Sequence, residues 1–382
     1  MFKGTKKVPS GEFSKIIAQA GGRDNAFTNK DYTAYFQQLH KSKLPLALKL
    51  EADRMQNLVL SGQEFEKEMK VVMEERRWRT DDKPQALVYE QLLATAFEAH
   101  PYRRPIIGWM NDLENMQVDD AVHWYRTWYA PNNATLVVVG DVKPIEVFNL
   151  ARRYFGAIKP KVFPVRKPQE EPQQIGIRRV TVKAPAKLPY LIMSYHVPVL
   201  RDAERDWEPY ALEILGGVLD GNESARLNRS LVRETQVASS TGASYDDTER
   251  GPGLFYLDGV PSEGKSVVDL ESAIRGELQK IVSDGVTDEE LNRVKAQVIA
   301  NEVFERDSVM AQARQIGAWE MSGLSYKTLD ILVEKLKAVS AEQVQAVAKK
   351  YFKDENLTVA VLDPQPLENK QPLKAPKGLR HD

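Results

Sequence analysis

The residues best placed to do chemistry are two carboxylates, Glu68 and Glu75, seven positions apart in a charged stretch. Two residues at this spacing share one face of a helix. A carboxylate held on a rigid helix is a good ligand for a divalent cation, and a second carboxylate nearby orients the ligand or a water molecule. The two residues alone leave another interpretation open, because a helix rich in Glu, Lys and Arg commonly forms a solvated face.

Few other residues could complete a metal site. The chain has no Cys and five His, and no two His lie within one helical turn. The composition therefore excludes disulfides, thiolate zinc sites, Cys nucleophiles and a HExxH motif. We predict that His100, in HPYRRP, and His196, at the end of a strand before Pro198, make structural contacts.

Length and charge limit the class of protein. The 382 residues carry 53 Lys and Arg against 54 Asp and Glu, with 42% hydrophobic and 28% charged residues. These values are typical of a globular protein with two or more domains. The balanced charge argues against a general nucleic-acid binder, and no apolar run approaches the roughly 18 residues of a membrane span.

An internal repeat organises the chain. Val118–Val142 and Val339–Pro364 each show a helical pattern ending in Tyr, a polar turn containing Asn, and a β-branched strand. Tyr129 corresponds to Tyr351 and Thr135 to Thr358, at the same offset to within one position. Gly62 and Gly285 share this offset, and each is predicted to end a helix as a C-cap.

The repeat predicts three segments: a first domain at 1–158, a Pro-rich, extended and exposed linker at 159–176, and a homologous second domain at 177–382. Residues 177–223 of the second copy have no partner in the first copy. The first domain is therefore expected to lack its opening strand, hairpin and helix. A misassigned gene start, cleavage of the chain and a naturally short domain would each explain this.

The predicted elements favour an α+β fold with two homologous domains, each a mostly antiparallel sheet with helices packed on one face. A helix at 11–20 is expected to be capped by Ser10, and capping boxes are expected at Thr287 and Ser340. Strands are expected as a pair within 26–39 and at 135–140 and 255–260. The other expected helices span residues 44–60, 64–80, 84–98, 118–129, 267–283, 287–306 and 340–351.

Several motifs then resemble the pitrilysin/insulinase family of zinc peptidases, in the bacterial branch related to mitochondrial processing peptidase. The resemblance runs in order over essentially the whole chain. The motifs are FKGT at 2–5, AGGRDNAFTNKDYTAYF at 20–36, VVMEERRWR at 71–79, HPYRRPIIGW at 100–109, YAPNNATLVVVGDV at 129–142 and GVTDEELNRVKAQ at 285–297.

The resemblance implies a zinc-dependent endopeptidase acting on peptides or unfolded segments. In that family the inverted motif HxxEH directly precedes the residues that match MFKGT, and it supplies two zinc His and the general-base Glu. These three residues are expected upstream of Met1, so no catalytic residue is expected in the given sequence, which is predicted to be inactive as it stands. Glu75 matches the third zinc ligand and Glu68 the carboxylate behind it.

The resemblance also implies a substrate site. Asn25, Ala26 and Phe27 match the start of an edge strand that holds substrate by β-augmentation. Arg233 matches an Arg that reaches the substrate carbonyl, although Ser240 stands where the family commonly has a Tyr. For Arg233 a surface ion pair is the simpler interpretation.

The implied partners are a peptide substrate and either a homologous subunit or a second copy, with no nucleic acid and no membrane span. The chain would be the zinc-side subunit of such a pair. A non-catalytic peptide-binding or scaffold subunit is the alternative, and a peptide-binding module unrelated to proteolysis is a third hypothesis. Resemblance to secreted bacterial relatives favours the periplasm over the cytoplasm.

Overall fold

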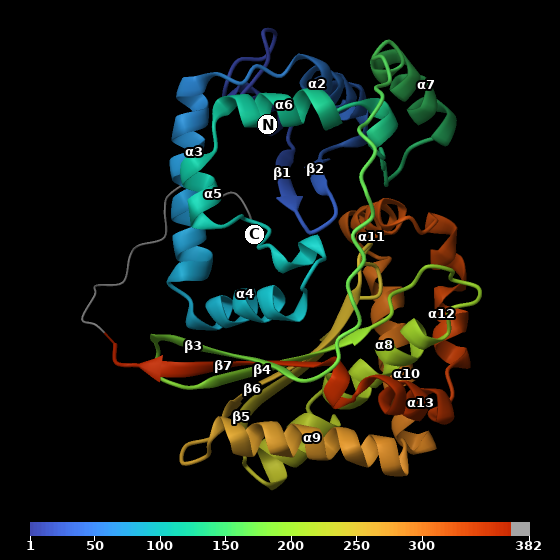
Figure 1. Ribbon diagram of the computed structural model, residues 1–382. Helices are drawn as coiled ribbons and strands as arrows, with labels where there is room; N and C mark the ends of the chain where they lie inside the picture. Colours follow the sequence, from blue (N-terminus) through green and yellow to red (C-terminus); the bar gives the residue numbers. More distant parts are fainter. Residues whose placement is uncertain (368–382) are drawn as a thin grey trace.

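The computed structural model describes residues 1–367, and it confirms the α+β class. We call residues 1–158 the first unit and residues 177–367 the second unit. The first unit is rich in helices and holds one two-stranded antiparallel hairpin, shown in blue to green in Figure 1. Its elements are α1 (Glu12–Gln19), β1 (Arg23–Thr28), β2 (Thr33–Gln38), α2 (Leu44–Asn57), α3 (Gly62–Arg76), α4 (Pro84–Ala96), α5 (Met110–Asn115), α6 (Val118–Trp128) and α7 (Pro144–Phe155).

The second unit contains a five-stranded sheet with the order β3-β7-β4-β6-β5. The β3–β7 pair is parallel and the other three pairs are antiparallel, so the sheet is mostly antiparallel as expected. The elements are β3 (Arg178–Pro185), β4 (Tyr190–Val197), α8 (Glu208–Asp220), β5 (Ala238–Tyr245), β6 (Gly253–Pro261), α9 (Val267–Asp284), α10 (Asp288–Glu305), α11 (Val309–Ser322), α12 (Leu329–Ala338), α13 (Ala341–Tyr351) and β7 (Leu357–Gln365).

Helices cover both faces of the five-stranded sheet, and the second cover comes from the first unit. Leu191, Met193 and Tyr195 of β4 point into the main core with α8, α9 and α13. The alternate residue Ile192 points to the opposite face, where it packs on α4. Figure 1 shows α4 lying across the sheet on the side away from α9. A strand buried on both faces becomes an almost continuous apolar run, as β4 is.

The predicted strand at 135–140 is wrong, because residues 134–139 form no ladder. The corresponding strand of the second unit, β7, lies between β3 and β4 and pairs with both. Residues 1–367 supply no counterpart of β3 or β4 to the first unit. A β-branched segment without neighbouring strands has nothing to exchange backbone hydrogen bonds with, so it stays extended but unpaired.

The helices of the two units show the same contrast in burial. In α13, Val344, Val347 and Ala348 are buried beneath α8. The corresponding helix α6 is amphipathic but has no buried residue, and Trp124 is 55% exposed. Among the described residues, no helix of the first unit therefore covers α6 in the way that α8 covers α13 in the second unit.

Most helix boundaries agree with the predictions, with three corrections at the caps. Gly62 is the first residue of α3, whose N-cap is Ser61, whereas Gly285 ends α9 with φ +76° as predicted. Gly11, not Ser10, occupies the N-cap of α1. The full capping box forms at Ser340, while Thr287 accepts a cap bond without the reciprocal one.

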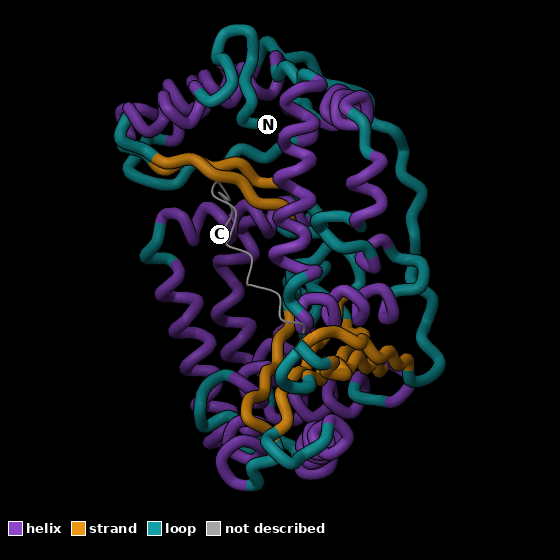
Figure 2. Tube along the Cα trace, turned by 90° about the vertical axis from the view of Figure 1, so that its left-hand side faces the viewer, coloured by secondary structure: helices purple, strands orange, loops and turns teal. Residues whose placement is uncertain are grey.

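The linker is extended along both units and is mostly exposed, and two residues of its second half contact the folded units. Val162 and Val165 lie almost fully in solvent, whereas Gln174 is buried and its amide donates to the Leu357 carbonyl at 2.7 Å. The Glu171 carboxylate accepts the backbone N–H groups of residues 98–100, just after α4. Figure 2 shows this long loop running from the first unit to the sheet. No helix among residues 1–367 is long and apolar enough to cross a membrane.

The packing of α4 on the five-stranded sheet predicts how much stability a cavity in this interface would remove. Leu92 is fully buried there, so Leu92→Ala should lower the free energy of unfolding by about 3 kcal/mol. Leu188→Ala, in the β3–β4 turn and 57% exposed, should change it by less than about 0.5 kcal/mol. Urea unfolding followed by tryptophan fluorescence measures both, and equal effects would contradict this account of the interface.

Candidate metal-ligand and peptide-binding site

Helix α3 carries both predicted carboxylates on one face, as the spacing indicates. Its N-terminus is fixed by Ser61, whose hydroxyl accepts the Glu64 N–H at 3.3 Å. The Glu75 side chain is 13% exposed and pairs with Arg79 at 3.1 Å. The Glu68 side chain is 44% exposed and pairs with Lys3 at 2.6 Å. Each carboxylate already has a cationic neighbour, so neither behaves as a freely solvated side chain.

A buried ion pair sets the position of α3. The Arg76 guanidinium donates two hydrogen bonds to the Glu90 carboxylate on α4, at 2.8 and 3.0 Å, and a third to the Gly108 carbonyl at 2.8 Å. The hydrogen-bonded Glu90 carboxylate raises the pKa of Arg76. Because Arg76 directly follows Glu75, this two-pronged contact fixes the backbone that carries the candidate metal ligand.

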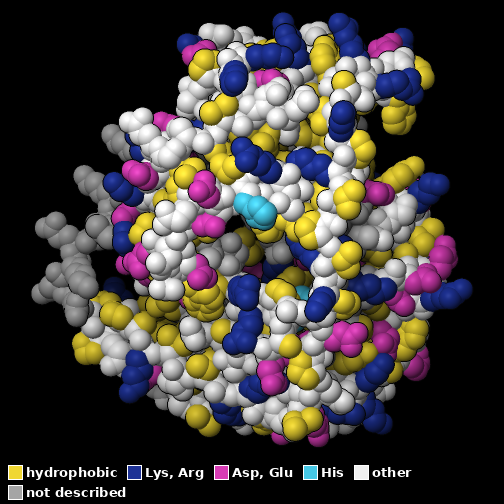
Figure 3. Space-filling model, turned by 45° about the horizontal axis from the view of Figure 1, so that its top comes forward, with side chains coloured by type: hydrophobic (Ala, Val, Ile, Leu, Met, Phe, Trp, Pro, Cys, Tyr) yellow, Lys and Arg dark blue, Asp and Glu magenta, His cyan; other side chains and the backbone are white. Residues whose placement is uncertain are grey.

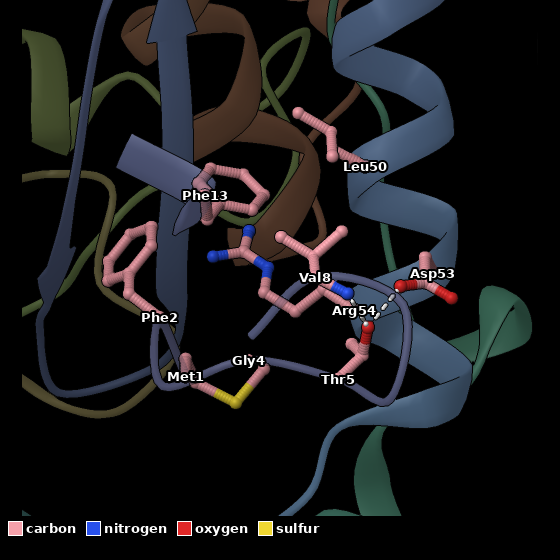
Figure 4. A pocket seen from close by; sticks show the side chains of 9 residues that line it. All are labelled: Met1, Phe2, Gly4, Thr5, Val8, Phe13, Leu50, Asp53 and Arg54. Carbon is pink, nitrogen blue, oxygen red and sulfur yellow. Dashed lines mark hydrogen bonds between the residues drawn. The ribbon is translucent and has the colours of Figure 1, made fainter. Parts of the chain in front are cut away.

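The FKGT segment packs against α2 through the buried side chain of Arg54 (Figure 4). The Arg54 guanidinium lies 4.9 Å from the ring centre of Phe2, 5.1 Å from that of Phe13 and 4.2 Å from that of Tyr35. Cation–π contacts of this kind stabilise a charge that burial has removed from water. They hold the start of the chain against α2.

Gly4 and Thr5 explain the rest of that motif. Gly4 has φ +104°, and a Cβ there would lie 2.6 Å from backbone atoms of residues 8–10, so a larger residue cannot fit. The Thr5 hydroxyl donates to the Asp53 carboxylate at 2.5 Å and accepts the Val8 N–H at 3.0 Å. This tight loop places Lys3 on Glu68, a contact that sequence reasoning missed because its two partners are far apart in the chain.

Asn25, Ala26 and Phe27 all lie in β1, as the resemblance implies. They pair with Phe36, Tyr35 and Ala34 of β2 respectively. Strand β1 has one strand neighbour among residues 1–367, so its other side is an edge that an extended peptide could join. In the view of Figure 1, β1 is the strand of the hairpin nearer to α3.

The second unit approaches this hairpin from below. The guanidinium of Arg314, on α11, lies 5.3 Å from the ring centre of Phe27. Lys30 in the β1–β2 turn forms an ion pair with Glu249 in the β5–β6 loop. In the space-filling view the surface is hollowed between the two units, with Lys and Arg side chains along the rim (Figure 3). Sequence reasoning missed Arg314, since no local signal links it to β1.

Arg233 lies in a π-helical turn, Asn228–Glu234, and forms an exposed ion pair with Glu223 at 2.5 Å. Ser240 is exposed on β5, an edge strand of the sheet. The Tyr245 hydroxyl donates to the Pro198 carbonyl at 2.6 Å, so it is occupied within its own unit. Among residues 1–367, Arg233, Ser240 and Tyr245 therefore show no hydrogen bond or ion pair with α3 or β1.

His100 and His196 flank Phe97 and make structural contacts. His196 Nε2 lies 3.0 Å from the Ala96 carbonyl, and His100 Nδ1 accepts the Tyr102 N–H at 3.3 Å. Within residues 1–367 no group of three or more His, Cys, Asp and Glu is arranged to hold a metal ion. A catalytic zinc site needs three protein ligands, and Glu75 with Glu68 would supply at most two.

Known proteins similar to this chain include zinc proteases. A family model for insulinase, peptidase family M16, matches residues 1–109, and one for the peptidase M16 inactive domain matches residues 115–298. The zinc protease PqqE of Helicobacter pylori is 32% identical over 375 residues, which cover 95% of this chain and 81% of that protein. The uncharacterized zinc protease YmxG of Bacillus subtilis is 26% identical, with 95% and 86% covered.

Solved structures agree with the fold. The crystal structure of a protease from Helicobacter pylori superposes with a TM-score of 0.89 at 29% identity, covering 95% of this chain and 87% of that one. A peptidase M16 inactive domain from Pseudomonas fluorescens gives a TM-score of 0.83 at 18% identity, with 96% and 87% covered. At the lower identity the likeness concerns the fold alone.

The buried His196 predicts a pH effect on stability. Burial lowers the pKa of its imidazole, so the unfolded chain takes up this proton more readily than the folded one. The stabilisation is present above the unfolded pKa of about 6.5 and is lost as the pH falls toward the lowered folded value. The free energy of unfolding should therefore fall from pH 7.5 to 5.5, and it should fall less in His196→Gln.

The matched control is His123→Gln, at an exposed position. It should retain the wild-type difference between the two pH values in urea unfolding. If His196→Gln also retains it, this imidazole does not contribute to the pH dependence.

Proposed function

Because this chain belongs to the insulinase family of peptidases, family M16, we propose that it is part of a zinc-dependent endopeptidase acting on peptides or unfolded segments. In this proposal Glu75 is a metal ligand, Glu68 supports it, and β1 is the edge on which the peptide pairs at Asn25, Ala26 and Phe27. Arg233 is a further candidate for peptide contact, although its described partner is Glu223.

The observation that carries the proposal is a comparison of α3 with its counterpart α10. At the offset that relates Gly62 to Gly285, the equivalent pairs are Glu68 and Leu291, Val71 and Val294, and Glu75 and Val298. Leu291 and Val294 are buried in the main core of the second unit. The corresponding face of α3 is only partly covered: Val71 is 43% exposed and the Glu68 side chain 44%, whereas the Glu75 side chain is 13% exposed.

Helix α8 covers that face of α10. A Cβ on Gly217 of α8 would lie 2.6 Å from Val294 Cγ1 and 3.4 Å from Val298 Cγ2, and Asn222, just after α8, donates to Gln297 at 2.8 Å. A helix docked on the first unit as α8 is docked on the second would therefore face Glu75. Leu291 and Val298 are apolar where the first unit has two carboxylates, which fits a ligand wall rather than a core.

The described residues do not make a zinc site by themselves, because Glu68 and Glu75 are the only candidate ligands among them and neither is a His. We propose that the two His and the general base stand on an HxxEH helix outside the given sequence, docked on α3 and α6 as α8 is on α10 and α13. The 382-residue chain is then inactive on its own. The proposed division into 1–158, 159–176 and 177–382 rests on the same repeat.

A second candidate is a non-catalytic peptide-binding or scaffold subunit of a heterodimeric peptidase. Ser240 and the outward ion pair of Arg233 favour it, because the second unit then contributes no group toward a substrate carbonyl. We further propose a homologous partner subunit or a second copy, and a periplasmic location; these rest on the family resemblance.

The proposal predicts a specific effect at Glu75. The protein is expressed with the in-frame coding sequence that precedes the Met1 codon, and zinc content and cleavage of a quenched fluorescent peptide are measured. Glu75→Gln should reduce bound zinc from about one equivalent to below about 0.1, with activity falling at least about 100-fold. Glu74→Gln, which makes the same charge change at an exposed neighbour, should leave both unchanged.

Three results separate the hypotheses. A stop codon in place of an upstream HxxEH contradicts the peptidase. Peptide binding without zinc or cleavage in the extended protein supports the non-catalytic subunit instead. An extended protein fully active as a lone homodimer contradicts the heterodimer.

A further inference from the structure

The tips of two hairpins, one from each unit, meet at the hydroxyl of Tyr102. This hydroxyl donates to Asp31 Oδ2 at 2.6 Å and accepts the Gly251 N–H at 2.8 Å. The same Asp31 oxygen accepts the backbone N–H of Arg250 at 3.1 Å. Residues 29–32 form the β1–β2 turn and residues 246–252 the β5–β6 loop, so a single side chain joins both.

Each tip is also held in one conformation from within. The Asn29 side-chain carbonyl accepts the N–H groups of Asp31 and Tyr32, both at 2.9 Å. On the other side, the Arg201 guanidinium donates to the backbone carbonyls of residues 249–251 at 2.7 to 2.8 Å. The two loops therefore meet as ordered surfaces.

The contact is close as well as polar. A Cβ on Gly251 would lie 2.6 Å from Cε2 of Tyr102 and 2.5 Å from Cε1 of His100, so glycine is needed for the approach. The Lys30 ammonium, which pairs with Glu249, lies 4.8 Å from the ring centre of Tyr102. Both partners of this ion pair are largely shielded from water.

Tyr102 itself is anchored on the five-stranded sheet. Its ring is 5% exposed and packs in a cluster with Phe97 and with Leu254 of β6. A two-stranded hairpin is barely stable alone, so outside contacts decide how β1 and β2 are oriented. At its other strand the hairpin is held by the Tyr35 hydroxyl, 2.7 Å from that of Tyr129. Tyr102 thus ties the orientation of β1 to the sheet of the other unit.

We propose that Tyr102 is a positioning residue: with Asp31 and Gly251 it latches the two hairpin tips together and so sets the angle at which the β1 edge meets an extended peptide. The link to peptide binding rests on the proposed function, whereas the latch between the tips does not. Release of the latch would separate the β1–β2 turn from the β5–β6 loop.

Tyr102→Phe tests the latch, because it keeps the ring and removes both hydroxyl contacts. Backbone hydrogen exchange at residues 29–32 and 249–252 should become about tenfold faster, as expected when a hydrogen bond to a charged group is lost. The affinity for a fluorescein-labelled unstructured peptide should fall by about fivefold or more. Tyr210→Phe is the control, since it loses one buried hydroxyl bond, to the Ala203 carbonyl, away from the tips.

Asp31 provides a second pair of variants that spare the aromatic core. Asp31→Ala should loosen both tips like Tyr102→Phe, whereas Asp31→Asn keeps an acceptor oxygen and should restore slow exchange. Wild-type exchange at the tips in Tyr102→Phe would overturn the latch, and loosened tips with unchanged peptide affinity would overturn the positioning role. A wild-type chain that binds no peptide would contradict the proposed function, while the exchange measurements would still decide the latch.

Discussion

The position of the candidate metal ligand depends on one buried ion pair, Arg76 with Glu90. Both side chains are 6% exposed, and their two parallel hydrogen bonds fix α3 relative to α4. Removing one partner of such a pair leaves a buried charge uncompensated, which typically costs about 3–5 kcal/mol. Since α4 packs on the five-stranded sheet, the pair connects Glu75 mechanically to the core of the other unit. The site is therefore built on the sheet of one unit and the helices of the other.

The repeat shows how one backbone can serve two purposes. In α10 the face that carries Leu291, Val294 and Val298 is covered by α8 and contributes to the main core. In α3 the same face carries two carboxylates, and Glu68 and Val71 on it remain partly accessible. Burying carboxylates without partners is costly, so this face cannot close as a core and is available for cations, as its pairs with Lys3 and Arg79 illustrate. The main hydrophobic core thus lies in the second unit, and the two candidate ligands lie in the first.

The sequence was informative wherever structure is decided locally. Hydrophobic periodicity predicted α2 and α9, and Ser340 with Gln343 predicted the capping box of α13, because these signals depend on neighbours within one or two turns. The segment at 134–139 has the same β-branched character as β7 yet forms no strand, since strand formation depends on partners elsewhere in the chain. For the same reason periodicity could not show that α4 covers a sheet whose strands all lie in the second unit.

In the candidate site, too, local features were predictable from the sequence and long-range contacts were not. The spacing of Glu68 and Glu75 correctly placed both on one helical face, but their neighbours Lys3 and Arg79 emerged from the folded chain. An exposed sheet edge is ordinarily a liability, because it can pair with any other edge. Here β1 lies between α3 and the second unit, with Arg314 over Phe27 and the turn attached at Tyr102. Under the proposed function, these surroundings favour pairing of β1 with an extended peptide over pairing with another sheet.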